Sequence, residues 1–287
     1  MGLFNRLVYG NPNKPDLEVE ESPNPIKAFF EVFKIKIWDL VKLNLIFALF
    51  MLPAIVWSVI NVQVLVLPDL TAIERDSVVF QYVLGLIPCL LVMGIGLPSL
   101  NYITKSYAKE FHVWMFDDFI EKIKENWKQS LLYMLILGVV MFLMYFSIRA
   151  YTSVLTDMAV TPIFRGILYI MAAFILLSTT YAYPLMVTFE LKLKHLIRNS
   201  MLLAIAKLPQ TLLILLITAI MPVFLIWLSM VWGYGFLVLI AYYLLFGFSL
   251  TSFIINAYTN QVFEKIIIAS GTSEAEKKPE IEHDKSK

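Results

Sequence analysis

Six stretches of the chain are long and apolar enough to cross a lipid bilayer. A helix that crosses roughly 30 Å of hydrocarbon needs about 20 mainly apolar residues, and no Lys, Arg, Asp or Glu lies deep inside any of these stretches. We therefore predict an all-α, polytopic membrane protein with six transmembrane helices. The predicted spans cover residues 43–62, 79–103, 130–148, 163–189, 211–231 and 234–258.

Basic residues gather on one side of this predicted membrane domain. Residues 1–42, 104–128, 190–209 and the C-terminal tail hold six, five, four and five Lys or Arg residues, together 20 of the 23 in the chain. The loops on the other side hold only Arg75, Arg149 and Arg165. Because cytoplasmic loops of membrane proteins carry the excess of Lys and Arg, both termini are predicted to face the cytoplasm.

The predicted organisation has three parts. Residues 1–42 form a polar cytoplasmic segment, residues 43–258 form the six-helix transmembrane domain, and residues 259–287 form a cytoplasmic tail. The tail is charged and has few large apolar side chains, so we expect it to be disordered after about residue 270.

The cytoplasmic segment between the second and third spans has the pattern of an amphipathic helix. Phe116, Phe119, Ile120, Ile123 and Trp127 recur at helical spacing and predict one apolar stripe. We expect Asp118 and Lys122 to form an i,i+4 ion pair beside it. Such a helix either lies against the membrane face or the bundle as a solvated loop helix, or docks a cytoplasmic partner. The residues that would carry docking are Trp114, Asp118, Phe119, Lys122, Asn126 and Trp127.

A second amphipathic segment lies between the fourth and fifth spans. Leu193, Leu196, Ile197, Leu203 and Ala204 can share one helical face there, opposite a basic face. Each amphipathic segment follows a span with a proline near its inner end, which is consistent with a parallel internal duplication.

Several polar residues and prolines fall inside the predicted spans. Amides in membrane helices commonly form interhelical hydrogen bonds, so the first interpretation is that they bridge helices. The alternative is that they line a cavity shaped by proline kinks, which free backbone carbonyls. The candidate intramembrane residues are Asn44, Pro98, Asn101, Tyr183, Pro184 and Asn256.

Composition narrows the chemistry that this chain can perform. With 59% hydrophobic and 16% charged residues, it differs from soluble domains, which carry about 25% charged residues.

The net charge of +1 gives no basis for binding nucleic acid. The single cysteine, Cys89, and three scattered histidines form no metal-binding pattern. We expect no cofactor, no metal and no enzymatic activity, and the lack of mid-membrane charges counts against ion-coupled transport.

Short motifs recur in a specific order through most of the chain up to about residue 215. They include Gly2-Leu3-Phe4-Asn5-Arg6, Lys42-Leu43-Asn44-Leu45, His112-Val113-Trp114, Asn126-Trp127-Lys128-Gln129-Ser130, Tyr183-Pro184 and Leu208-Pro209. In this combination the chain resembles the YesL-like family of bacterial integral membrane proteins. It departs from that pattern between Ala54 and Phe80, where an acidic loop is inserted.

The resemblance implies a place in the bacterial plasma membrane and an association with carbohydrate uptake. It implies no catalytic or ligand-binding residue. We expect the lipid bilayer as one partner and components of an ABC-type sugar importer as another, with the chain as an accessory or regulatory component. The alternative is a permease-like transporter subunit for a small molecule or oligosaccharide. A cavity lined by aromatic and amide side chains would favour the permease, and a solid core would favour the accessory protein.

Overall fold

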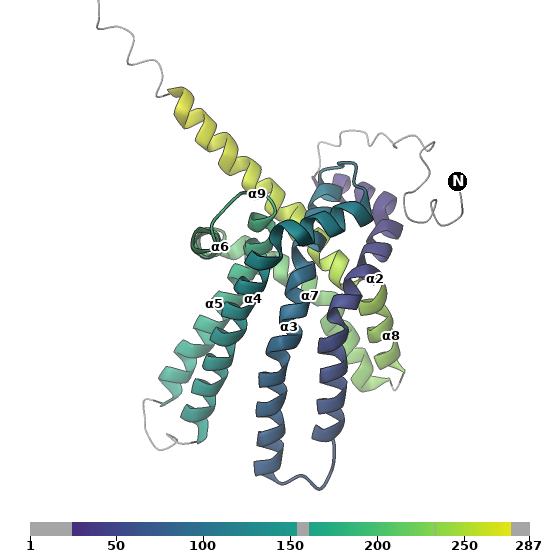
Figure 1. Cartoon of the computed structure of the whole chain (residues 1–287), viewed down its shortest axis with the longest axis vertical. Coiled ribbons are helices and arrows are strands. Elements are labelled where there is room, and N and C mark those ends of the chain that lie inside the picture. The colour runs from purple at the N-terminus through teal and green to yellow at the C-terminus, as the bar shows by residue number, and fades with distance from the viewer. Residues whose placement is uncertain (1–24, 154–160, 233, 277–287) are drawn as a thin grey trace, which may run out of the picture.

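The computed structural model describes residues 25–153, 161–232 and 234–276, and they form an all-helical bundle (Figure 1). No β-strand occurs within these ranges, so the predicted fold class is confirmed. In chain order the elements are α2 (Pro25–Leu65), α3 (Ala72–Ala108), α4 (Met115–Ser153), α5 (Thr161–Met186), α6 (Leu193–Ala206), α7 (Leu208–Val231), α8 (Gly235–Tyr242), the π-helical segment η1 (Tyr243–Gly247) and α9 (Phe248–Glu276).

Within the described ranges, six helical runs are long and apolar enough to cross a membrane, as the sequence predicts. Five are α2, α3, α4, α5 and α7, and the sixth is the continuous run through α8, η1 and α9. Each predicted stretch lies in one of these runs, apart from Tyr234 and residues 187–189, which are in turns or bends. The chain therefore belongs to the six-span class of membrane proteins.

Several helices continue beyond the apolar stretches. Helix α2 begins at Pro25, and the first predicted amphipathic segment is the beginning of α4 rather than a separate helix. The second one is the separate helix α6. Helix α9 extends to Glu276, past the point where we expected disorder to begin, and residues 277–287 lie outside the described ranges. Continuous backbone hydrogen bonding lets a helix leave the hydrocarbon layer without a break.

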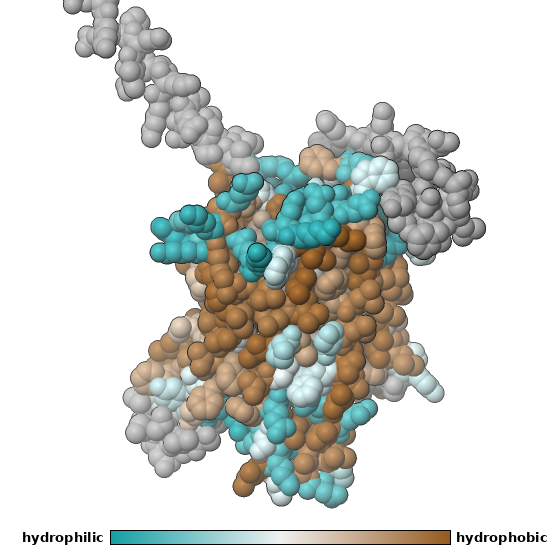
Figure 2. Space-filling model, in the orientation of Figure 1, coloured by the Kyte–Doolittle hydropathy of each residue, from teal (hydrophilic) through white to brown (hydrophobic). Residues whose placement is uncertain are grey.

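On the face shown in Figure 2, polar surface lies at both ends of the bundle and an apolar band covers the middle. One end comprises the beginning of α2, the end of α3, the beginning of α4 and helix α6 (upper part of Figure 1). We refer to it as the basic end, because it carries most of the basic residues counted above. In the predicted orientation this end faces the cytoplasm.

The tightly packed core lies toward the basic end. One cluster joins α2, α3, α4 and α9 through residues such as Phe47, Ile103 and Phe253. Another joins α4, α5, α6 and α9 around Tyr181 and Leu196. Away from this end, α4 and α5 diverge from α2 and α3 (Figure 1). The basic end is thus the part of the bundle that packing holds together.

Close contact between α3 and α4 depends on a glycine. A Cβ atom at Gly94 would lie 2.7 Å from Cγ of Met134, closer than side-chain atoms can approach. Small residues at helix interfaces in membranes allow this kind of close contact.

The hairpin of α7 and α8 has few buried residues. Within α7 only Thr211 and Leu225 are buried, and within α8 only Gly235. Its remaining apolar side chains form surface suited to lipid acyl chains, which solvate them without the cost of water contact.

The predicted orientation can be tested with single cysteines in a Cys89→Ala background. Asp69 lies in the exposed turn between α2 and α3, and Lys192 is exposed at the basic end. We expect a membrane-impermeant maleimide to label Asp69→Cys on intact cells, and Lys192→Cys only after permeabilisation. The opposite labelling pattern would contradict the orientation.

Candidate functional site

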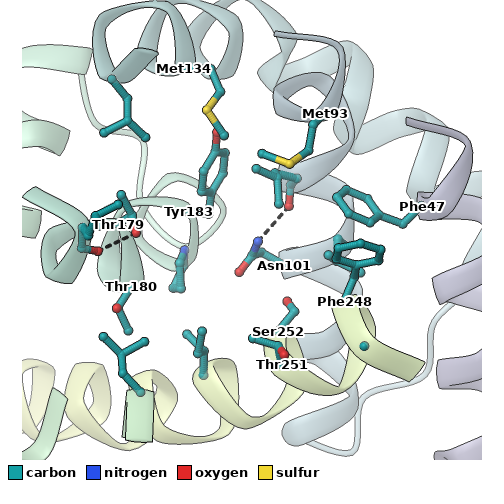
Figure 3. Close-up of a pocket in the computed structure, with 18 of the residues that line it drawn as sticks. Phe47, Met93, Asn101, Met134, Thr179, Thr180, Tyr183, Phe248, Thr251 and Ser252 are labelled. Atoms are coloured by element: carbon teal, nitrogen blue, oxygen red, sulfur yellow. Dashed lines mark hydrogen bonds between the residues drawn. The ribbon is translucent and has the colours of Figure 1, made fainter. Parts of the chain in front are cut away.

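A cavity of about 410 Å³ lies among the spanning helices (Figure 3). Residues of α2, α3, α4, α5, α7, η1 and α9 line it, so every spanning run contributes to it. Its apolar part includes Phe47, Met93, Leu97 and Phe248, and none of the described residues that line it is charged. The lining residues with polar side-chain atoms are Asn101, Thr179, Thr180, Tyr183, Tyr243, Thr251 and Ser252.

A buried hydrogen-bonded network connects α3 to α9 beside the cavity. The Asn256 side-chain nitrogen donates to Oδ1 of Asn101 at 2.9 Å and lies 3.0 Å from Oγ1 of Thr104. Thr104 also shares a hydrogen bond of 2.8 Å with Ser252. All four residues are buried. Asn101 and Asn256 therefore bridge two helices, and Asn101 in addition lines the cavity.

The side chain of Asn44 holds the π-helical segment η1 against α2. Its nitrogen donates to the carbonyls of Tyr243 at 2.8 Å and Leu244 at 2.7 Å. Its oxygen accepts from the backbone N–H groups of Phe248 and Ser249, each at 3.0 Å. A π-helix breaks the regular i→i−4 ladder and occurs frequently at functional sites. Because Tyr243 and Gly247 line the cavity, Asn44 positions part of its wall.

Pro98 links α3 to α4. A proline has no backbone N–H, so Pro98 leaves the carbonyl of Gly94, four residues earlier, without its helical donor. The hydroxyl of Ser130 donates to that carbonyl from α4. Pro98 thus leaves a free carbonyl in α3, and a side chain of α4 donates a hydrogen bond to it.

Tyr183 and Pro184 place the end of α5 at the cavity. Both are buried and line it. The Tyr183 hydroxyl is 3.4 Å from that of Ser130, and its ring packs edge-to-face against Tyr133 at a centroid distance of 5.6 Å. Of the six candidate intramembrane residues, Asn101, Tyr183 and Pro184 line the cavity, while Asn44, Pro98 and Asn256 support residues around it.

The apolar stripe expected at the beginning of α4 is divided between two environments. Phe119 is buried, and its carbonyl accepts a hydrogen bond of 2.6 Å from Ser99, while Ile123 is partly buried. Phe116, Ile120 and Trp127 remain 47%, 38% and 43% exposed. Only one edge of the stripe therefore packs against the bundle.

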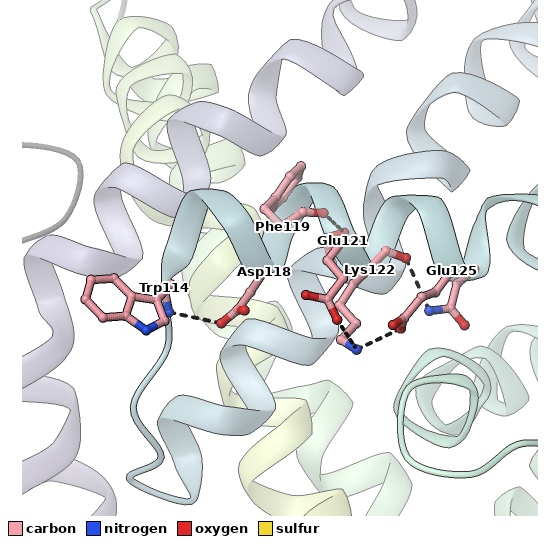
Figure 4. Close-up of polar contacts among 8 residues, drawn as sticks. Trp114, Asp118, Phe119, Glu121, Lys122 and Glu125 are labelled. Carbon is pink, nitrogen blue, oxygen red and sulfur yellow. Dashed lines mark hydrogen bonds and ion pairs between the residues drawn. The ribbon is translucent and has the colours of Figure 1, made fainter.

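The expected Asp118–Lys122 ion pair does not form (Figure 4). Asp118 accepts a hydrogen bond of 3.0 Å from the backbone N–H of Trp114, because N–H groups before the first helical turn lack helical partners. Lys122 instead pairs with Glu125 at 2.7 Å and Glu121 at 3.5 Å.

Two other contacts complete the environment of this segment. The Lys122 ammonium lies 4.8 Å from the centre of the Tyr102 ring. The Asn126 amide donates to the Lys122 carbonyl within the same helix at 3.2 Å. The six candidate docking residues thus belong to one short segment, but only part of it is available to another molecule.

The comparisons with known proteins add no relative. No protein-family model matches the chain, and no curated protein or solved structure to which it was compared matches it. Among the described residues, no group of three or more His, Cys, Asp or Glu side chains is placed to hold a metal ion.

Removing the Asn44 amide should destabilise the bundle. Asn44→Ala would remove the four hydrogen bonds that join α2 to the sixth span. Since hydrogen bonds between membrane helices contribute roughly 0.6 kcal/mol each, we expect a loss of about 2 kcal/mol, measured by unfolding in detergent.

Asn61→Ala is the matched control on the same helix. Asn61 is also buried, but its amide donates only to the Trp57 carbonyl of α2 itself. Equal destabilisation by the two substitutions would contradict the role assigned to Asn44.

Proposed function

We propose that this integral membrane protein binds a small molecule inside its helical bundle and acts as a permease-like subunit. The observation that carries the proposal is the cavity formed by all six spanning runs. Its volume of about 410 Å³ is within the roughly 300–1,000 Å³ typical of ligand pockets. Aromatic, amide and hydroxyl side chains line it together, which favours this function over that of an accessory protein with a solid core.

The walls of the cavity differ in the contacts that hold them. The α3–α9 network and Asn44 hold two walls by hydrogen bonds. The wall formed by α5 contains Pro184, and the α7 wall contributes Leu215 from a sparsely packed helix. Helices interrupted by proline or by irregular turns commonly form binding sites in transporters.

Partly filling the cavity should weaken binding. Leu137 lines the cavity on α4, and Leu135, two residues earlier, is exposed and outside the lining set. We expect Leu137→Trp to weaken binding about tenfold or more, because overfilling a packed site costs about 1–3 kcal/mol, while Leu135→Trp leaves binding unchanged.

The measurement is the ligand-induced increase in melting temperature of the purified protein. The panel contains neutral alcohols and ketones of increasing apolar size together with oligosaccharides. The binding function would be contradicted if no compound raised the melting temperature of the unmodified protein. It would also be contradicted if every such increase were equally large in Leu137→Trp.

A second function is supported by the exposed edge of the α4 stripe. Phe116, Ile120 and Trp127 form an unpacked apolar row beside charged residues at the basic end. We propose that this row contacts a membrane or cytoplasmic component of an ABC-type sugar importer in the bacterial plasma membrane. That proposal also uses the resemblance to the YesL-like family.

Crosslinking from position 124 tests the docking proposal. Lys124 is exposed beside the row, whereas Lys122 is engaged by Glu125. We expect a photo-crosslinking residue at 124 to capture an importer subunit in native membranes, identified by mass spectrometry. The same residue at exposed position 194 of α6 should not capture it. Lipid adducts alone from position 124 would rule out the docking role.

A further inference from the structure

Two threonine hydroxyls at the cavity have no hydrogen-bond partner among the described residues. Thr180 of α5 is only 4% exposed, and Thr251 of α9 is partly buried. Both line the cavity (Figure 3). Across the described residues, no hydrogen bond joins either hydroxyl to another group.

This lack of partners is unusual for threonine in an apolar helix. A helical threonine can bond to the carbonyl three or four residues earlier, and Thr179 does so, 2.7 Å from the Leu176 carbonyl. A buried hydroxyl without any partner is unfavourable. Each of the two hydroxyls can therefore donate a hydrogen bond to a molecule in the cavity and accept one from it.

The backbone next to Thr180 adds a further possible acceptor. Pro184 lies four residues after Thr180 and has no N–H to donate to its carbonyl. At Pro98 the equivalent carbonyl, that of Gly94, is bonded by Ser130. No side chain of the described residues makes a corresponding bond to the Thr180 carbonyl.

Among the described residues, every other polar lining side chain except Tyr243 is already hydrogen-bonded. Asn101 accepts from Asn256 and donates to the Leu97 carbonyl at 2.9 Å. Ser252 bonds to Thr104. The cavity thus offers a small number of unpaired hydrogen-bonding groups, and the rest of its surface is mainly apolar.

We infer that Thr180 and Thr251 form the polar subsite of the cavity, and that its ligand is a neutral, mainly apolar molecule with one hydroxyl, carbonyl or amide group. The inference rests on the proposed binding function and specifies its ligand class. An ion would lack a charged partner in the lining. A free sugar would leave most of its hydroxyls unpaired, which is costly away from water.

Matched photoaffinity probes can test this ligand class. The probes are a diazirine-bearing dodecanol and the corresponding diazirine-bearing alkane, applied to the full chain in lipid nanodiscs. We expect both to label cavity residues, as located by mass spectrometry, with the alcohol binding about three- to tenfold more tightly, the range expected for one hydrogen bond.

The variants Thr180→Val and Thr251→Val remove each hydroxyl while keeping the side-chain shape. Each substitution should reduce the affinity advantage of the alcohol probe over the alkane probe. Thr218→Val is the control, because Thr218 of α7 is not a lining residue and its hydroxyl is bonded to the Leu215 carbonyl at 3.0 Å. It should leave the preference unchanged. Melting temperatures of all three variants show whether each one folds.

The possible results separate this inference from the proposed function. Equal labelling of the cavity by both probes, or a preference that survives both substitutions, would overturn the polar subsite but leave cavity binding intact. Labelling confined to the outer lipid-facing surface, with none in the cavity, would overturn both. Loss of the preference in Thr218→Val as well would also contradict the assignment.

Discussion

A backbone N–H or C=O group inside the hydrocarbon layer has no water to bind, so every departure from the regular helix there needs a partner within the protein. Two such departures organise this bundle. The π-helical segment η1 breaks the ladder of the sixth span, and the amide of Asn44 binds two carbonyls and two N–H groups around it. Pro98 frees the carbonyl of Gly94, and Ser130 binds it from α4. Each of these two irregularities is thereby compensated by a side chain of another helix.

These compensating contacts also explain where the cavity lies. The contacts through Asn44, Ser130 and Asn256 hold α2, α3, α4 and α9 together near the basic end. The cavity lies among the helices that these contacts join, together with α5 and α7. Gly247, in the π-helical segment, and Pro184, in α5, both line it. The same polar groups thus stabilise the bundle and leave a pocket within it.

The two candidate sites differ in how far the pattern of residues could predict them. Asn101, Tyr183 and Pro184 stood out because polar and kinking residues are unusual in apolar helices, and they line the cavity. Thr180 and Thr251 did not stand out, since a helical threonine is normally satisfied by its own backbone, and only the fold shows that these two are not. On α4 the periodicity of Phe116, Phe119 and Trp127 marked an apolar stripe. It did not indicate that Phe119 alone of the three would be buried, because a stripe is wider than the contact with one neighbouring helix.

The sequence by itself determined the class of protein, because the free energy of placing a stretch in a membrane depends on the composition and length of that stretch alone. It therefore predicted six spanning helices, their approximate limits and the one-sided distribution of Lys and Arg. The tertiary structure decided which residues meet. The pairing of Asn44 with η1, about 200 positions away, depends on helix rotation and packing, which the pattern within one helix does not specify. The cavity is likewise a property of several helices at once, so no single segment contains it.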